Sequence, residues 1–353
     1  MLALVTGANG LIGANLCRAL LRDGYDVRAM VRTSSDLGAL KDLKLSIVYG
    51  DVLQPDTLFA AIAGCDLVFH AASVFSYWGI TDADLERTAV EGVSNVLVAS
   101  RAASVKRVVL TSSSVVFGSS SHTIVRSEND VPDETSSPTY CLSKLHQERT
   151  AIKLASDLDL DLVVVNPCMT VGPHDVKLSP SNGIILAYLS DPFRSTFPGG
   201  CNIVSVTDVA RGHILAAEKG CRGECYLLGS ENLEWSFIHR IIGELCGVAG
   251  PQLYANHTVS FLAATAHEIW AQFTGTRPTT TREQAKMVGQ FYWYSHAKAQ
   301  NELGYAPTSA RGALAKAIAS LVSSRHVSVQ LRQTLSLGRE IYDARAALLK
   351  EDL

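Results

Sequence analysis

The chain has 353 residues, of which 47% are hydrophobic and 18% are charged. This length allows two or three domains, or one large α/β domain with an appended lobe. The 31 basic and 34 acidic side chains give a net charge of −3, which disfavours an electrostatic nucleic-acid partner. The hydrophobic content also excludes an intrinsically disordered chain. We therefore expect a globular protein with a sizeable core.

The eight cysteines show no CxxC spacing, and no zinc-type cluster follows the closest pair, Cys221 and Cys225. We therefore expect neither a metal site nor a disulfide framework. The N-terminus starts directly with an apolar strand pattern and shows no secretory signal, so we expect a cytoplasmic protein. The apolar stretch 259–273 contains His267 and Glu268 and is shorter than the ~20 residues that span a bilayer. We interpret it as a buried or interface helix and expect no membrane span.

The first half of the chain alternates apolar runs of strand length with helical patterns. This alternation predicts a doubly wound parallel sheet of the Rossmann type, with helices on both faces. The predicted strands are residues 2–6, 27–32, 45–49, 67–71, 107–112 and 162–166, and the predicted helices are residues 11–23, 55–63, 82–103 and 138–158.

Gly and Pro clusters break the chain into shorter elements after residue 167. We predict an α/β fold with a dinucleotide-binding domain at 1–170 and a smaller mixed substrate-binding lobe at 171–325. A strand near 204–209 and the helix after it are expected to return to the first sheet, within residues 202–228. The aromatic run 291–294 is interpreted as a strand that packs the second lobe. Residues 326–353 predict one amphipathic helix that extends beyond this lobe.

The sequence TGANGLIG, residues 6–13, lies directly between the first predicted strand and a helix. Gly7, Gly10 and Gly13 allow a tight turn, a close approach of a pyrophosphate to the helix N-terminus, and close packing of helix on strand. We therefore predict a dinucleotide site here. The alternative, a glycine-rich turn without a ligand, is disfavoured by this position between strand and helix.

The second predicted strand ends at Arg32, 19 residues after Gly13, where NAD enzymes carry a ribose-binding carboxylate. A guanidinium fits the charge and shape of a 2′-phosphate, so we expect NADP, with NAD left open. The alternative is that Arg32 is a solvated residue at the strand end. Asp51 and Val52 follow the third strand, where this fold contacts adenine.

Tyr140 and Lys144 are four residues apart in a predicted helix and project from one face. Ser113 follows the fifth strand, at the sheet edge that holds ligands in α/β folds. A tyrosine is a poor acid–base group near neutral pH unless neighbouring cations favour its phenolate. Together with the glycine motif, Ser113, Tyr140 and Lys144 predict a catalytic group.

The chain resembles the extended short-chain dehydrogenase/reductase family. The resemblance rests on TGANGLIG, Asp51-Val52, CDLVFHAAS (65–73), LTSSSVVFG (110–118), YCLSK (140–144) and VVNPCMTVGP (164–173). The strand VRAMVR is similar to the branch of dihydroflavonol reductases and 3β-hydroxysteroid dehydrogenases. VGPHDVKLSPSNGII and SHAKAQNELGYAP are also similar to the hopanoid-associated sugar epimerases.

This resemblance implies that Ser113 orients the substrate, that Tyr140 is the acid–base group and that Lys144 contacts the nicotinamide ribose. It places the backbone near Pro167 and Cys168 against the carboxamide, and it implies a homodimer through the helices 82–103 and 138–158. The remaining predicted nucleotide contacts are Asn9, Leu11, Ile12, Ala71, Ala72 and Ser73.

Two positions depart from the family pattern. Ala89 stands where many members carry an Asn, so a proton relay built on that Asn must be rearranged. Ser205 stands where relatives often carry a His. His70, within the fourth strand, is interpreted as a packed histidine, and Cys141, beside Tyr140, as a small residue on the helix face rather than a nucleophile.

The loop SVFSYWG, residues 73–79, opens beside the nicotinamide in this fold. An apolar and aromatic wall suits a lipophilic carbonyl or alcohol, whereas a nucleotide sugar requires cations for its pyrophosphate. The predicted substrate-binding residues are Phe75, Tyr77, Trp78, Phe117, Met169 and Tyr188, and Phe193 and Phe197 are further predicted members of the wall.

We therefore expect an NADP-dependent reductase or dehydrogenase that moves a hydride between nicotinamide and a carbonyl or alcohol carbon of a small molecule. Two alternatives stay open. One is an NAD-dependent nucleotide-sugar epimerase or dehydratase with the same fold and triad. The other is a non-catalytic nucleotide-sensing protein, which the presence of Ser113, Tyr140 and Lys144 disfavours.

Overall fold

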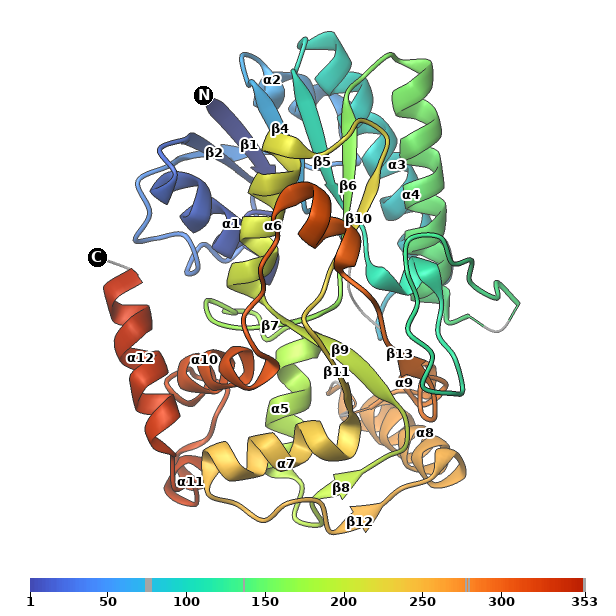
Figure 1. Cartoon of the computed structure of the whole chain (residues 1–353), viewed down its shortest axis with the longest axis vertical. Coiled ribbons are helices and arrows are strands. Elements are labelled where there is room, and N and C mark those ends of the chain that lie inside the picture. The colour runs from blue at the N-terminus through green and yellow to red at the C-terminus, as the bar shows by residue number, and fades with distance from the viewer. Residues whose placement is uncertain (74–77, 136, 277, 279, 352–353) are drawn as a thin grey trace.

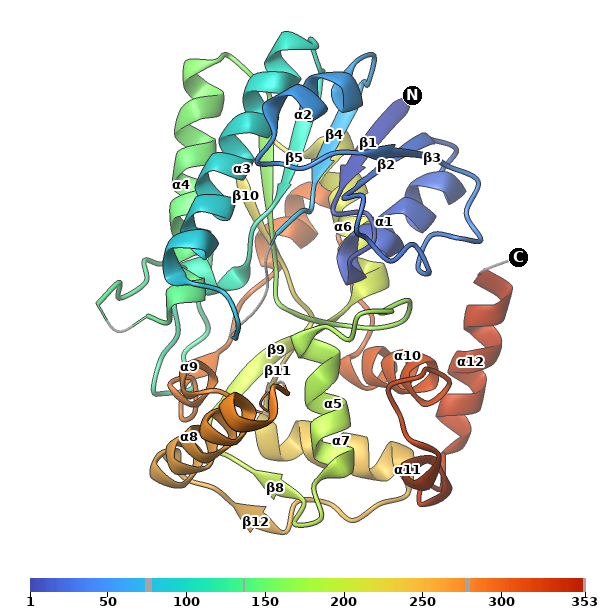
Figure 2. The ribbon, with the colours of Figure 1, turned by 180° about the vertical axis from the view of Figure 1, so that it is seen from behind.

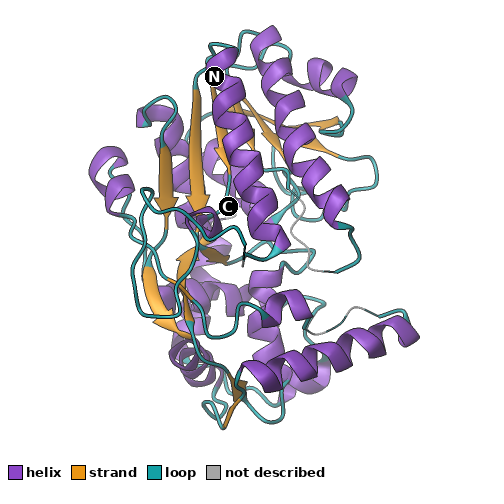
Figure 3. Ribbon diagram, turned by 90° about the vertical axis from the view of Figure 1, so that its right-hand side faces the viewer, coloured by secondary structure: helices purple, strands orange, loops and turns teal. Residues whose placement is uncertain are grey.

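The structure is a computed structural model that describes residues 1–73, 78–135, 137–276, 278 and 280–351. It has two stacked regions (Figure 1): a large sheet with helices on both faces, and below it a lobe in which helices surround smaller sheets. The side view in Figure 3 shows the same two layers, with the strands of the large sheet enclosed between helices.

The large sheet has seven parallel strands in the order β10-β6-β5-β4-β1-β2-β3. The chain first builds β1, β2 and β3 toward one edge and then returns to place β4 beside β1. This reversal of strand order creates the position at which open α/β sheets bind ligands. The strands are β1 (Leu2–Thr6), β2 (Asp26–Val31), β3 (Ser46–Tyr49), β4 (Leu67–His70), β5 (Arg107–Thr111), β6 (Leu162–Pro167) and β10 (Cys225–Leu228). The six strands predicted from the sequence are confirmed, with ends that differ by one residue at most.

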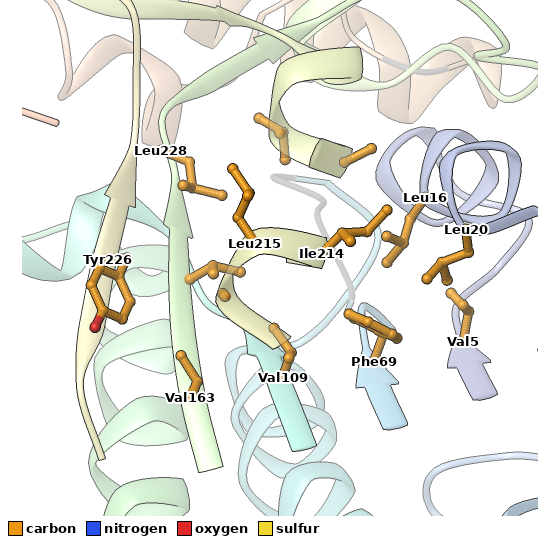
Figure 4. Close-up of a cluster of buried hydrophobic side chains, with 14 of the residues drawn as sticks. Val5, Leu16, Leu20, Phe69, Val109, Val163, Ile214, Leu215, Tyr226 and Leu228 are labelled. Atoms are coloured by element: carbon orange, nitrogen blue, oxygen red, sulfur yellow. The ribbon is translucent and has the colours of Figure 1, made fainter. Parts of the chain in front are cut away.

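Two helices cover one face of the sheet and three cover the other (Figures 1 and 2). The first pair is α1 (Leu11–Arg22) and α6 (Val206–Lys219), and the opposite layer is α2 (Pro55–Ile62), α3 (Asp82–Ala102) and α4 (Thr139–Asp157). Figure 4 shows Leu16 of α1 and Ile214 of α6 over Val5, Phe69 and Val109 of the strands. Burial on both faces explains why these strands are almost continuously apolar.

The second lobe is built around β9 (Gly200–Ser205). This strand pairs with β7 (Met169–Val171), β11 (Glu231–Glu234) and β13 (Phe291–Tyr292), and β8 (Ser195–Thr196) pairs separately with β12 (Leu253–Tyr254). The helices of the lobe are α5 (Pro180–Ser190), α7 (Trp235–Cys246), α8 (His257–Thr274), α9 (Arg282–Ala285), α10 (Ala310–Val322), α11 (Val329–Gln333) and α12 (Arg339–Glu351). The short helices are η1 (Ser114–Phe117) and η2 (Ala299–Leu303). The aromatic run is a strand of this lobe only at Phe291–Tyr292, which pairs with β9, whereas Tyr294 is buried in the core of the large sheet.

The strand predicted near 204–209 does not return to the first sheet. It is β9, which ends at Ser205 and lies in the smaller sheet, because its hydrogen-bonding partners are β7, β11 and β13. The helix that follows it, α6, does return to the large sheet, and so does β10. The chain therefore passes between the two regions more than once, and the division at residue 170 stays a prediction.

The C-terminal segment forms two helices, α11 and α12, instead of the single predicted helix. The turn between them is tied to the end of α7, because the N–H groups of Ser336 and Gly338 donate to the carbonyls of Cys246 and Leu245, each at 2.9 Å. Ile341 of α12 is buried in the core of the second lobe. This segment is thus part of that core rather than an extension beyond it.

The apolar stretch 259–273 is helical, as predicted, but it is not buried. In α8, Leu262, Trp270 and Phe273 are 64%, 67% and 85% exposed, whereas Glu268 lies on the buried side and pairs with Arg282. Of the two predicted alternatives, burial is therefore wrong for the large apolar residues of this helix, and an interface helix stays a prediction. Within the part of the chain that the structure describes, no helix is long and apolar enough to cross a membrane.

Candidate active site

The glycine-rich turn after β1 is shaped by close backbone contacts. Gly7 has a φ of +65°, and its carbonyl accepts a hydrogen bond of 2.9 Å from the N–H of Gly10. A Cβ on Gly7 would lie 2.7 Å from the Cα of Ala72, and a Cβ on Gly13 would overlap the carbonyl oxygen of Gly7. Larger residues would therefore force the turn away from the β4 loop and from α1.

Helix α1 begins at Leu11 with Gly10 as its N-cap, and no side chain at that position caps the helix. The amides of the first turn, at Leu11, Ile12 and Gly13, thus face the sheet edge with the positive end of the helix dipole. Such a turn fits the pyrophosphate of a dinucleotide, because backbone N–H groups bind it and no Cβ blocks its approach.

The β1 turn is fixed to the loop that follows β4. The Thr6 hydroxyl accepts a hydrogen bond of 3.1 Å from the N–H of Ala72 and contacts His70 Nδ1 at 2.8 Å. Burial lowers the pKa of His70 to about 3, so this histidine is neutral and packed. Ala71 and Ala72 are half-buried and Ser73 is exposed at the same edge. The structure therefore brings the β1 turn and this predicted nucleotide segment together.

The residues predicted to contact the adenosine part of the nucleotide gather at the carboxyl ends of β1, β2 and β3. Arg32 follows β2 and is exposed, and Asn9 donates from Nδ2 to the carbonyl of Asp36 at 3.2 Å. Asp51 follows β3, where its carboxylate accepts from the N–H of Leu53 at 2.9 Å, and Val52 is buried. Arg32 is thus an exposed cation at this edge.

The predicted catalytic side chains meet at the ends of β5 and α4. Ser113 follows β5 as the N-cap of η1, and Tyr140 is in the first turn of α4. Burial raises the pKa of Tyr140 above its ordinary value, while a hydrogen bond from Ser113 opposes this increase. The tyrosine therefore holds its proton at neutral pH in this structure.

Lys144 lies one helical turn after Tyr140 and is almost fully buried. Its Nζ donates to the carbonyl of Thr111 at 3.2 Å and to Oε1 of Gln147 at 2.8 Å. Burial lowers the pKa of Lys144 to about 8, and the charge of Glu148 opposes that decrease. Sequence reasoning missed Gln147, although its position three residues after Lys144 on one helix places the two side chains together.

A second buried group that sequence reasoning missed supports the serine loop. Asn166 of β6 donates from Nδ2 to Oε2 of Glu148 at 2.6 Å and to the carbonyl of Ser113 at 3.3 Å. Glu148 follows Lys144 by four residues, so the same face of α4 carries both the lysine and the carboxylate that binds Asn166. Only the fold reveals this contact, because Ser113 follows β5 and Asn166 lies in the neighbouring strand β6, 53 residues later in the sequence.

The backbone near Pro167 and Cys168 is already hydrogen-bonded. The N–H of Cys168 donates to the carbonyl of Leu228 at 3.1 Å, and its carbonyl accepts from the Thr170 hydroxyl at 2.9 Å. Burial raises the pKa of the Cys168 thiol above its ordinary value, which makes it an unreactive packing residue. The predicted contact of this segment with a carboxamide stays a prediction.

The residues predicted to line the substrate pocket do not share one environment in the part of the chain that the structure describes. Trp78 and Met169 are half-buried, while Phe75 and Tyr77 lie outside the described residues. Phe117 packs into the core of the large sheet, where it is 5% exposed.

Tyr188 and Phe197, both predicted to wall the pocket, pack around His239 in the second lobe. The Tyr188 ring stacks on His239 with a centroid separation of 4.5 Å, and its hydroxyl donates to the carbonyl of Ala249 at 2.9 Å. Phe197 also packs against His239, whereas Phe193 is 68% exposed. These contacts describe how Phe117, Tyr188 and Phe197 pack, and their place in a substrate wall stays a prediction.

The second lobe also contacts the catalytic region through residues that the sequence did not single out. Glu283 of α9 accepts a hydrogen bond of 3.4 Å from the N–H of Thr139, directly before Tyr140. The Tyr294 hydroxyl donates to the carbonyl of Gly118 at 2.8 Å. Sequence reasoning assigned the aromatic run 291–294 to packing alone. The contact of Tyr294 with the η1 loop could be seen only in the folded structure.

Ala89 and Ser205, the two departures from the family pattern, both lie in or beside helices of the large sheet. Ala89 is buried in α3. Ser205 is the N-cap of α6, with its hydroxyl accepting from the N–H of Thr207 at 3.3 Å. A helix N-cap explains a serine at position 205, because the hydroxyl satisfies an otherwise unpaired amide.

A doubly wound parallel sheet, a glycine turn shaped for a pyrophosphate, and a Ser-Tyr-Lys group at the same sheet edge define a nicotinamide-dependent oxidoreductase of the Rossmann class. Comparison with known proteins gives the family. The profile of the NAD dependent epimerase/dehydratase family matches residues 3–229, and the chain belongs to this family, within the extended short-chain dehydrogenases/reductases.

Individual relatives cover nearly the whole chain. A Synechocystis sp. protein named as a dihydroflavonol 4-reductase is 34% identical over 92% of this chain and 96% of its own length. The sterol demethylase protein B of Methylococcus capsulatus is 32% identical over 90% of this chain and 98% of its own. The crystal structure of gox2253 matches with a TM-score of 0.82 and 33% identity, over 93% of this chain and 99% of that one. The chain is therefore an NAD(P)-dependent oxidoreductase with a small-molecule substrate.

Proposed function

We propose that the enzyme is an NADP-dependent reductase that transfers a hydride to the carbonyl carbon of a lipophilic or aromatic small molecule, or runs the reverse reaction. The observation that carries this proposal is Arg32, an exposed cation directly after β2, at the edge where Asn9 and Asp51 also lie. A guanidinium at this position suits a 2′-phosphate, whereas the ribose hydroxyls of NAD are bound by a carboxylate in this fold.

The bound nicotinamide would supply the hydride, and the residues of this chain would supply the proton. Tyr140 holds a proton at neutral pH because burial raises its pKa, so it is suited to donate this proton to a carbonyl oxygen as the hydride arrives. Ser113 would hold the same oxygen, and Lys144 would contact the nicotinamide ribose. In the reverse direction Tyr140 would accept the proton of an alcohol.

The Ser113–Tyr140 hydrogen bond and the buried Lys144 support this division of roles. Gln147 and the Thr111 carbonyl hold the ammonium of Lys144, which follows Tyr140 by one helical turn on α4. A buried cation that approaches a tyrosine lowers the pKa of its phenol, which favours removal of the proton in the alcohol direction.

The proposal of a lipophilic substrate rests on the relatives and on two described residues. Both relatives are named for chemistry on ring systems, a dihydroflavonol and a sterol. Trp78 and Met169 remain candidates for an apolar wall, because both are half-buried and follow strands of the site. The family name favours the alternative, a nucleotide-sugar epimerase or dehydratase that retains NAD.

One experiment separates the two activities. Freshly purified enzyme is denatured and the released nucleotide is identified, and the enzyme is then assayed with NADPH and a panel of aromatic and alicyclic ketones. Consumption of NADPH with a ketone, at a rate that falls in Tyr140→Phe, supports the reductase. Retained NAD together with interconversion of UDP-sugars without added nucleotide would overturn the proposal.

We further propose that the enzyme works in the cytoplasm as a homodimer through α3 and α4. The support is the family resemblance, together with Val98 of α3, which is 43% exposed on the outer layer of the large sheet. Light scattering of the purified protein gives the mass directly. A charge placed at this position, Val98→Glu, should favour the monomer if the helices pair.

A further inference from the structure

A loop of the second lobe reaches the predicted adenosine edge of the large sheet. Residues 172–179 follow β7 and pass over the start of α1, where Asn15 Nδ2 donates to the carbonyl of Pro173 at 2.9 Å. Val176 reaches the segment after β2, since a Cβ on Gly38 would lie 3.5 Å from Val176 Cγ1. The loop thus places Lys177 close to the chain that follows Arg32.

The loop is held by its own hydrogen bonds rather than by packing alone. Asp175 Oδ2 accepts from the N–H of Ser179 at 2.7 Å, from its hydroxyl at 2.6 Å and from Asn182 Nδ2 at 2.9 Å. Asn182 also bonds both backbone groups of Gly172, which closes the loop at its other end. A cation carried by this loop therefore has a defined position.

The C-terminal segment fastens the same loop from outside. His326 donates from Nε2 to the carbonyl of Val176 at 3.0 Å, and Arg325 Nη2 lies 3.5 Å from that carbonyl and 3.5 Å from Asp36 Oδ2. Asp36 belongs to the segment after β2. The β2 segment, the 172–179 loop and the C-terminal segment consequently meet at one place.

The charges at this meeting point are not balanced. Val176 brings Lys177 beside the segment after β2, and burial and the nearby charge of Arg32 lower the pKa of Lys177, whereas the charge of Asp36 raises it. The Asp36 carboxylate is shared with Arg325. Among the described residues, no carboxylate lies within 4.0 Å of the charged atoms of either Arg32 or Lys177. Two adjacent cations without a close counter-ion favour an anion between them.

We propose that Lys177 is the second cation of an anion site that it forms with Arg32, and that the ligand of this site is the 2′-phosphate of NADP. This inference rests on the proposed function, in which Arg32 selects NADP. The forked guanidinium of Arg32 would bind two phosphate oxygens, and the ammonium of Lys177 would act as a point charge from the opposite side. The second lobe thus contributes to cofactor choice as well as to substrate binding.

The test compares dissociation constants for NADPH and NADH, measured by fluorescence titration at low ionic strength. Lys177→Gln should weaken NADPH binding about 3- to 10-fold and leave NADH binding unchanged, because only NADPH carries the 2′-phosphate. Lys177→Arg should retain most of the NADPH affinity. Asp36→Asn should strengthen NADPH binding about 2-fold or more, since it removes the opposing negative charge.

Lys350→Gln, at an exposed lysine near the end of α12, is the matched control and should change neither constant. If Lys177→Gln leaves the NADPH constant unchanged while Arg32→Ala raises it, Lys177 is not part of the site, although the proposed cofactor stands. Equal weakening of NADPH and NADH by Lys177→Gln would also overturn the inference, because it indicates a structural role. If Arg32→Ala leaves the ratio of the two constants unchanged, the NADP assignment itself fails.

Discussion

The sequence predicts both the glycine turn after β1 and an aromatic pocket wall from the second lobe. The turn depends on the backbone of its own segment, whereas the aromatic side chain of Tyr188 depends on neighbours from elsewhere in the chain. Gly7 has a φ of +65°, and a Cβ on Gly13 would overlap the carbonyl oxygen of Gly7, so the backbone of the turn itself requires glycine at both positions. Tyr188 was predicted to wall a pocket, yet it stacks on His239 and satisfies its hydroxyl with a backbone carbonyl. A turn between strand and helix can be predicted from a short sequence window, whereas an aromatic residue can be assigned to a pocket only when its distant neighbours are known.

The same difference applies to the catalytic group. The four-residue spacing of Tyr140 and Lys144 is a property of one helix, and the position of Ser113 after β5 follows from the parallel sheet. The contacts that hold them come from elsewhere: Thr111 and Gln147 for the lysine, and Asn166 for the serine loop. The sequence therefore identified the group but not its supports.

The largest effect is expected at the catalytic tyrosine. Tyr140→Phe removes the hydroxyl that would transfer the proton but keeps the ring and its packing, so kcat should fall about 10²- to 10⁴-fold while nucleotide affinity is retained. Steady-state kinetics and a nucleotide titration of the same preparation check both parts. Near-native kcat in the variant would show that a different acid acts here and that the triad interpretation is wrong.

Substitutions in α12 test whether the contacts of the C-terminal segment stabilise the second lobe. Ile341 of α12 is 2% exposed in the core of this lobe, and its neighbour Tyr342 is 57% exposed. Ile341→Ala should lower the free energy of unfolding by about 2–5 kcal/mol, because it leaves a cavity, whereas Tyr342→Ala should change it by less than about 1 kcal/mol. Urea unfolding measures both. Equal, small effects would instead support the original prediction of an extension outside the core.

A smaller, pH-dependent effect is expected from His239, which supports Tyr188 in the second lobe. Burial lowers the pKa of His239 from 6.5 to about 4, so the unfolded state binds more protons between these values. Stability should therefore fall as the pH falls from 6.5 to 4, by on the order of 3 kcal/mol from this residue. His239→Gln should flatten this part of the pH profile of the free energy of unfolding. His70 and His213, whose pKa values burial also lowers, remain in the variant, so the slope of the profile should decrease without reaching zero.

The central claim is that the edge beside β2 selects NADP, and the ratio of the dissociation constants for NADH and NADPH tests it directly. We expect the native enzyme to bind NADPH more tightly, and Arg32→Ala to reduce that preference by about 10- to 150-fold, chiefly through weaker NADPH binding, since one charge-assisted contact to the 2′-phosphate is lost. A native enzyme that prefers NADH, or an Arg32→Ala variant with an unchanged ratio, would contradict the account.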